Sequence, residues 1–147
     1  MRGIAYALGL AAGFGLTVQV AMNSQLRKFL ESANTAALVS FMVGALALVA
    51  LVIGTRAPIP TRETLVAVPV WAWFGGMLGA FYVASSTVVA AELGATTLLA
   101  LALAGQLATA LVIDHYGWLG MPVHSITLTR ITGVVLLGIG VWLIARP

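Results

Sequence analysis

Five long stretches without a charged residue alternate with short polar segments along this chain. They cover residues 3–26, 32–55, 64–91, 93–113 and 131–145. An α-helix needs about 20 mostly apolar residues to cross the hydrocarbon core of a bilayer, so each stretch predicts one transmembrane helix. We expect helices over about residues 4–25, 36–54, 66–90, 95–113 and 127–145, the last reaching its length by including residues 128–130. The predicted fold is an all-α integral membrane protein with a single transmembrane domain over residues 1–147.

The polar segments fit the ends of these helices. Arg27 and Lys28 cannot lie in hydrocarbon unless their side chains reach the interface, so we expect the first helix to end before them. Asn34 or Thr35 is expected to cap the second helix, and Ser125 the fifth. Residues 91–94 leave room only for a tight hairpin between the third and fourth helices.

Composition excludes several classes of protein. Hydrophobic residues make up 61% of the chain and charged residues 7%, against about one quarter charged in soluble domains. The seven basic residues are scattered among the helix ends, so no basic patch exists to bind nucleic acid. The chain has no cysteine, which excludes disulfides, thiolate catalysis and cysteine-bound metals. Arg2 and the apolar run after it resemble a signal peptide, but the run is long and continues into amide residues, so we expect it to stay uncleaved.

The basic residues are almost evenly divided between the two sides of the membrane. With five spans, one side carries Arg2, Arg56, Arg62 and Arg130, and the other side carries Arg27, Lys28 and Arg146. Such a weak bias permits insertion in both orientations. Transporters are commonly built from inverted repeats with the substrate site between them, and five helices contain no obvious second half. We therefore expect an antiparallel homodimer, in which a second copy supplies the inverted repeat.

The first helix carries two neutral amides in an otherwise apolar run. Gln19 and Asn23 are one helical turn apart, on the face that also holds Gly15. They are candidates for binding a substrate, although amides in membranes also bond across helices as packing contacts. Gln106, in the middle of the fourth helix, allows the same two interpretations. Gly9 and Gly13 form a GxxxG spacing that favours close helix packing.

The third helix begins with small residues and continues with hydroxyls. Gly75 and Gly79 repeat the small-xxx-small spacing. Tyr82, Ser85 and Ser86 follow on adjoining positions of one face, and we take Tyr82 and Ser86 as further candidates for substrate binding. The alternative is that the serines bond to carbonyls of their own helix.

Three charged residues are candidates for coupling or gating. Glu92 is a possible proton site, or an anion placed favourably before the fourth helix. Asp114 and Arg130 flank the same loop and are expected to form an ion pair. His115 and His124 share that loop but match no metal-ligand spacing, so we expect no metal site and no cofactor. No catalytic motif is present, and we expect that the protein is not an enzyme.

Several short motifs are together similar to one known family. They are the residues at Gly13, Gln19, Asn23 and Leu26, the run WFGGMLGAFYV at residues 73–83, AGQL at residues 104–107, IDHYGW at residues 113–118, and Arg130 with GVVLL at residues 133–137. This pattern resembles the YdcZ-like family of bacterial inner-membrane proteins, in the drug/metabolite transporter superfamily. The resemblance implies a five-helix subunit that works as an antiparallel pair, made of one dual-topology protein or of two oppositely oriented paralogues. The related small multidrug resistance proteins carry a membrane-embedded glutamate in their first helix, where this chain has Gln19.

The sequence thus predicts an inner-membrane transporter. We expect export of small polar or amphiphilic metabolites or drugs by alternating access in an antiparallel homodimer. Two alternatives remain at this point: a scaffold or assembly subunit that transports nothing, or one half of a heterodimeric transporter with an inverted paralogue.

Overall fold

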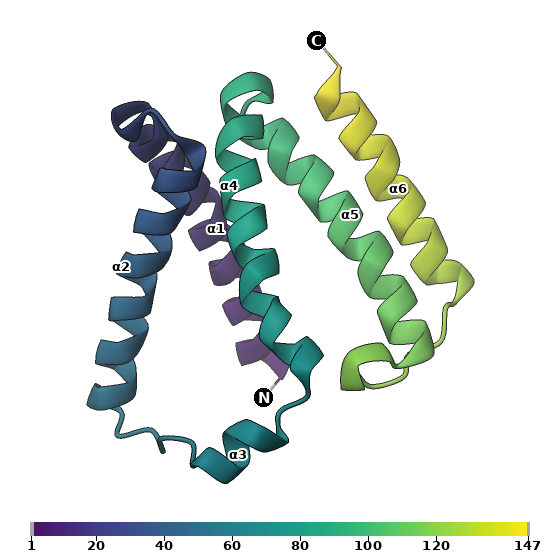
Figure 1. The fold of residues 1–147 in the computed structure, drawn as a ribbon. Helices are drawn as coiled ribbons and strands as arrows, with labels where there is room; N and C mark the ends of the chain where they lie inside the picture. Colours follow the sequence, from purple (N-terminus) through teal and green to yellow (C-terminus); the bar gives the residue numbers. More distant parts are fainter. Residues whose placement is uncertain (1, 147) are drawn as a thin grey trace. The chain divides into compact units, whose positions relative to one another are not determined.

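The computed structural model describes residues 2–146, and the regular elements among these residues are all helices, with no strand (Figure 1). The elements are α1 (Arg2–Leu30), α2 (Ala33–Gly54), α3 (Arg62–Ala67), η1 (Val70–Trp73), α4 (Phe74–Leu93), α5 (Ala95–Tyr116), η2 (Trp118–Gly120) and α6 (Leu128–Ala145). Five segments are long and apolar enough to cross a membrane: Gly3–Leu30, Val70–Leu93, and all of α2, α5 and α6. The predicted all-α fold with five spans is therefore confirmed.

The chain divides into two compact units. The N-terminal unit, residues 2–91, holds α1, α2, α3, η1 and nearly all of α4. The C-terminal unit, residues 92–146, holds α5, η2 and α6.

The first helix is longer than the sequence predicted. It continues through Arg27 and Lys28 to Leu30, so the expectation that the two cations end the helix is wrong. Cations in the last turn are favourable because they face the negative end of the helix dipole. Glu31 then adopts a left-handed conformation with φ 54° and stops the helix. Ser32 caps α2, its hydroxyl accepting a hydrogen bond from the Thr35 amide at 3.2 Å, where we had expected a cap at position 34 or 35.

The third span is interrupted where the sequence predicted a continuous helix over residues 66–90. Helix α3 ends at Ala67, and Val68 and Pro69 are extended, with ψ of 125° and 140°. Proline has no amide hydrogen and disfavours a helical residue before it, which explains the break. The membrane-spanning part is therefore Val70–Leu93, made of η1 followed by α4.

The N-terminal unit is packed at one end and open at the other. Its buried side chains are Val20 and Asn23 of α1, Ala36 and Ala37 of α2, and Val83, Ser86 and Thr87 of α4. Helices α1 and α2 meet at the turn after Leu30 and diverge away from it (Figure 1). Every residue of α1 from 3 to 15, and of α2 from 41 to 54, is exposed.

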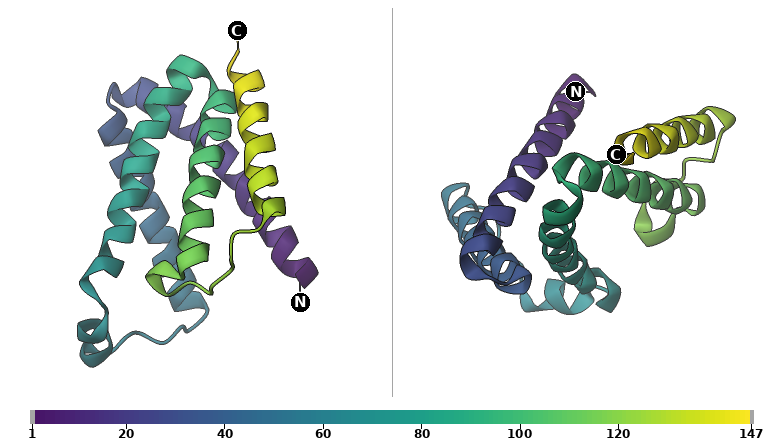
Figure 2. Two further views of the ribbon diagram at one scale, coloured as in Figure 1. Left: turned by 90° about the vertical axis from the view of Figure 1, so that its right-hand side faces the viewer. Right: turned by 90° about the horizontal axis from the view of Figure 1, so that it is seen from above.

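The C-terminal unit is an antiparallel pair of helices. Helices α5 and α6 lie side by side in every view (Figures 1 and 2). Gly94, with φ 81°, precedes α5, and Gly117, with φ 64°, ends it. Thr127 caps α6 by accepting a hydrogen bond from the Arg130 amide at 3.3 Å, in place of the expected Ser125.

Gly117 is the glycine whose replacement should most damage this unit. A Cβ added there would lie 2.7 Å from Val123 Cγ2, at a backbone conformation that other residues rarely adopt. We expect Gly117→Ala to lower the free energy of unfolding by about 1–2 kcal/mol, measured by denaturant titration in mixed micelles. Gly54→Ala is the control, because Gly54 lies at the end of α2 with nothing within 4 Å of an added Cβ. Equal stability of the two variants would refute the clash.

Candidate functional site

Helices α1 and α4 approach each other near one end of the N-terminal unit, where a hydrogen bond from Arg27 joins them. On α1 the stripe runs through Val20, Asn23, Ser24 and Arg27, and on α4 through Val83, Ser86, Thr87 and Ala90. Both stripes follow the i, i+3, i+4, i+7 spacing of a single helix face. We call these eight residues the polar contact.

Arg27 joins the two helices of the polar contact. Its Nη1 donates a hydrogen bond to the Thr87 carbonyl oxygen at 3.0 Å. The three hydroxyls instead bond within their own helices, Ser24 to the Val20 carbonyl at 2.8 Å, Ser86 to that of Val83 at 2.8 Å, and Thr87 to that of Ala84 at 2.9 Å. Ser86 therefore bonds to a carbonyl of its own helix, three residues earlier. This was the alternative to substrate binding that we considered for the serines.

The two amides of α1 lie in different environments. Asn23 is 5% exposed and belongs to the polar contact. Gln19 is exposed, one position away from the buried Val20. Among the described residues, neither amide forms a hydrogen bond with another side chain or with the backbone. Gln19 therefore lies outside the packed face of its own unit.

The other two polar candidates, Tyr82 and Gln106, also differ in their exposure. Tyr82 is half-buried, and its hydroxyl is a buried polar atom without a partner among the described residues. A buried hydroxyl without a hydrogen bond costs about 1–3 kcal/mol, so this group lacks a partner that it needs. Gln106 is exposed in the middle of α5.

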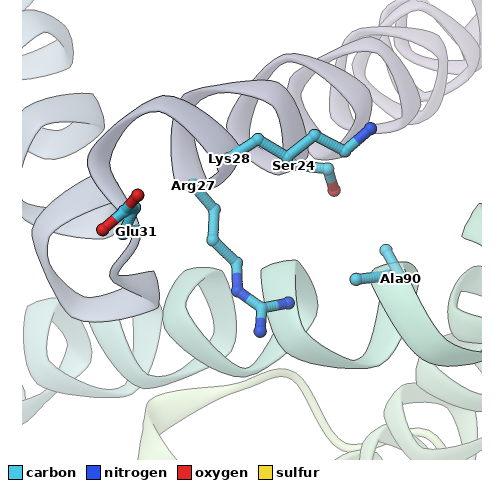
Figure 3. Close-up of a pocket in the computed structure, with 6 residues that line it drawn as sticks. Ser24, Arg27, Lys28, Glu31 and Ala90 are labelled. Atoms are coloured by element: carbon cyan, nitrogen blue, oxygen red, sulfur yellow. The ribbon is translucent and has the colours of Figure 1, made fainter.

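A pocket of about 470 Å³ lies beside the polar contact (Figure 3). It is lined by Ser24, Arg27 and Lys28 of α1, by Glu31 just after that helix, and by Ala90 and Ala91 of α4. Arg27 points toward α4, while Lys28 runs along α1 past Ser24. The pocket was not predicted from the sequence, because the two cations were interpreted only as the end of the first helix. The signal was the spacing of Arg27, four residues after Asn23 and on the same helix face.

The expected ion pair of the C-terminal unit is confirmed. Arg130 Nη1 lies 3.4 Å from Asp114 Oδ2 and 3.1 Å from the His124 carbonyl oxygen, to which it also donates. The two side chains are 38% and 27% exposed, so the pair contributes less than about 1 kcal/mol to stability. They lie at the polar end of an otherwise apolar groove of about 380 Å³ between α5 and α6. A role in coupling or gating stays a prediction.

The remaining charged and histidine candidates lie apart from these sites. Glu92 is exposed in the last turn of α4 and has no ion-pair partner among the described residues. The His115 Nδ1 atom accepts a hydrogen bond from the Ile126 amide at 3.2 Å. The His124 Nδ1 atom lies 3.1 Å from the Pro122 carbonyl oxygen. Both histidines thus help to hold the connection between α5 and α6.

The glycines predicted to pack helices are mostly open. At Gly9, Gly13 and Gly75, an added Cβ would meet no atom within 4 Å. At Gly79 it would lie 3.5 Å from the Phe41 ring, so this glycine contributes to contact between α2 and α4.

Comparison with known proteins assigns the sequence of this chain to a family. Residues 4–143 match the family model DMT_YdcZ, described as "Putative inner membrane exporter, YdcZ". The chain is 30% identical over 137 residues to the "Inner membrane protein YdcZ" of Escherichia coli (strain K12), covering 93% of this chain and 91% of that protein. No solved structure matches the chain. The five spans and the matched family make it a multi-pass inner-membrane protein. The chain belongs to the DMT_YdcZ family.

Proposed function

We propose that this protein exports small polar or amphiphilic molecules by alternating access in an antiparallel homodimer. The observation that carries the proposal is the exposed amide of Gln19 on an apolar helix. Export itself is favoured by the family description, an inner membrane exporter.

Gln19 lies too deep in the membrane to be satisfied by bulk water. It precedes Arg27 by eight residues, which is about 12 Å along a helix. The exposed apolar side chains of Val18 and Met22 surround it. An amide facing lipid there would lose its hydrogen bonds, at a cost of several kcal/mol. The hydrogen-bond partner of the Gln19 amide must therefore come from outside the N-terminal unit. Gln106, which is also exposed, needs a partner from outside the C-terminal unit.

A second, inverted copy would meet this requirement. The exposed halves of α1 and α2, residues 3–15 and 41–54, leave the N-terminal unit open at the end away from the polar contact. The nearly even division of basic residues between the two sides allows a copy to insert upside down. Two inverted copies then form the repeat that transporters of this kind use, with the substrate site near the midplane.

The proposed cavity is lined by neutral groups. Its candidate residues, taken from both copies, are Gln19, Asn23, Tyr82, Ser86 and Gln106. Amides and hydroxyls donate and accept hydrogen bonds without charge, which suits uncharged polar solutes and the polar ends of amphiphiles. Asp114, Arg130 and Glu92 are the proposed coupling or gating groups at the membrane surfaces.

Topology is the most direct test of the homodimer. Because the chain has no cysteine, one cysteine can be added at either terminus and labelled with a membrane-impermeant maleimide. We expect each terminus to be labelled in right-side-out and in inside-out vesicles. Labelling from one side alone would overturn the homodimer and would point to an inverted paralogue as partner.

Two variants with fixed orientation provide the matched control. Ala57→Lys with Ile59→Lys adds charge on one side, and Gln25→Lys with Phe29→Lys adds charge on the other. Each variant alone should insert in one orientation and should not export. Co-expression of the two should restore export, and failure to do so while both insert would contradict the antiparallel pair.

A further inference from the structure

The pocket beside the polar contact has the chemistry of an anion site. Two of its six lining residues are cations, Arg27 and Lys28, and one is an anion, Glu31. Among residues 2–146 the single ion pair joins Asp114 and Arg130, so neither cation of the pocket is paired with a carboxylate. Arg27 uses Nη1 to bind the Thr87 carbonyl, and a guanidinium has five N–H donors in all. Arg27 therefore keeps unused donors and Lys28 keeps an unpaired ammonium group, and both side chains line the same pocket.

The depth of the pocket indicates where its ligand comes from. The uncharged run over residues 3–26 is about 36 Å long as a helix, which exceeds the roughly 30 Å hydrocarbon core. Arg27, Lys28 and Glu31 follow this run and thus lie at the level of the lipid headgroups. At that level the abundant anionic group is the phosphate of a phospholipid.

The wall opposite the cations is small and uncharged. Ala90 and Ala91 of α4 line it (Figure 3), and they leave about 470 Å³ open. This volume accommodates a phosphate with its attached headgroup. The Ser24 hydroxyl bonds to the Val20 carbonyl and still has lone pairs, so it can accept a hydrogen bond from a hydroxyl of the headgroup.

We propose that this pocket binds a phosphate group, held by Arg27 and Lys28, with a phospholipid headgroup at the membrane surface as its source. Glu31 also lines the pocket, and its negative charge opposes the binding of a phosphate. None of its lining residues is among those proposed for the transport cavity, and its test does not depend on export.

Lys28→Gln is the variant that reports binding alone, since Arg27→Gln would also remove the bond to the Thr87 carbonyl. The full-length protein in detergent is titrated with phosphatidylglycerol or phosphatidylcholine, and bound lipid is measured by native mass spectrometry. The wild type should retain phosphatidylglycerol in preference to phosphatidylcholine. Lys28→Gln should bind phosphatidylglycerol about fivefold more weakly, and Glu31→Gln should bind it more tightly.

A binding site predicts that Lys28→Gln weakens lipid binding and that Glu31→Gln strengthens it. If the two charges only stabilised the fold, both substitutions would weaken binding. Arg62→Gln is the matched control, because it removes one exposed cation at the start of α3 and should leave binding unchanged. Equal retention of the two lipids, or equal affinity in Lys28→Gln and Arg62→Gln, would overturn the proposal. A competition titration with inorganic phosphate at constant ionic strength then tells whether the bound phosphate group comes from the lipid or from the aqueous phase. If it fails to displace phosphatidylglycerol, the lipid is the ligand, and if it displaces the lipid from the wild type at millimolar concentration, the phosphate site stands with an aqueous source.

Discussion

Gln19→Leu should reduce export to background while the protein still inserts and dimerises. The side chain is exposed on α1 within a hydrophobic run, so leucine in its place fits both lipid and a helix interface. What the substitution removes is a neutral donor and acceptor near the middle of the membrane. A site built to hydrogen-bond a substrate discriminates strongly when one partner is missing, so we expect at least a tenfold loss of rate.

Efflux from proteoliposomes measures this effect. The vesicles are loaded with a mixture of neutral polar solutes and amphiphilic dyes, and the released compounds are quantified by mass spectrometry. Gln25→Leu is the matched control, since it makes the same chemical change at another exposed position of α1, close to the helix end. Unchanged efflux in Gln19→Leu, or an equal loss in both variants, would remove Gln19 from the cavity.

The five spans could be predicted because lipid imposes a simple condition on sequence. A segment that crosses the bilayer must be long, apolar and helical, and uncharged runs show all of this directly. The Asp114–Arg130 pair was also accessible, because both residues flank one short connection. Neither prediction needs to know how distant helices pack, because the spans follow from length and hydropathy and the pair joins the two ends of one connection.

The ends of the helices were harder to predict, since the membrane boundary and the helix boundary differ. Arg27 and Lys28 leave the hydrocarbon, yet nothing in their backbone stops the helix, which continues to Leu30. At Pro69 the opposite holds: the sequence stays apolar while the backbone cannot remain helical. Hydropathy alone therefore predicts the span and misses the break.

The different burial of the two amides of α1 could not be predicted from the sequence. Successive residues turn by about 100° on a helix, so positions four apart drift by about 40°. The packed stripe passes through Val20, Asn23 and Arg27, which leaves Gln19 just outside it. Sequence spacing placed both amides on one face, but where that face ends depends on how α1 packs in the N-terminal unit.

If the proposed antiparallel dimer forms through the GxxxG face of α1, leucines at Gly9 and Gly13 should dissociate it and abolish efflux together. An added Cβ meets no atom within 4 Å at either position, so the N-terminal unit can accept both side chains. Leucine also has a higher helix propensity than glycine by nearly 1 kcal/mol per residue, so α1 itself should not be weakened. The loss would therefore arise between copies, where a GxxxG face needs close backbone approach.

The matched control for this pair is Ala7→Leu with Ala11→Leu. These residues have the same spacing on the same helix, but they lie about 200° around it from Gly9 and Gly13, so a specific interface should tolerate leucine there.

Gly79→Leu should have a different effect, because the new side chain would collide with the Phe41 ring and destabilise the subunit itself. Energy transfer between labelled copies in liposomes reports association, and thermal unfolding reports the subunit. If Gly9→Leu with Gly13→Leu keeps full energy transfer, the face of α1 that carries these glycines is not the dimer contact, and the inverted copy must meet the chain through other helices.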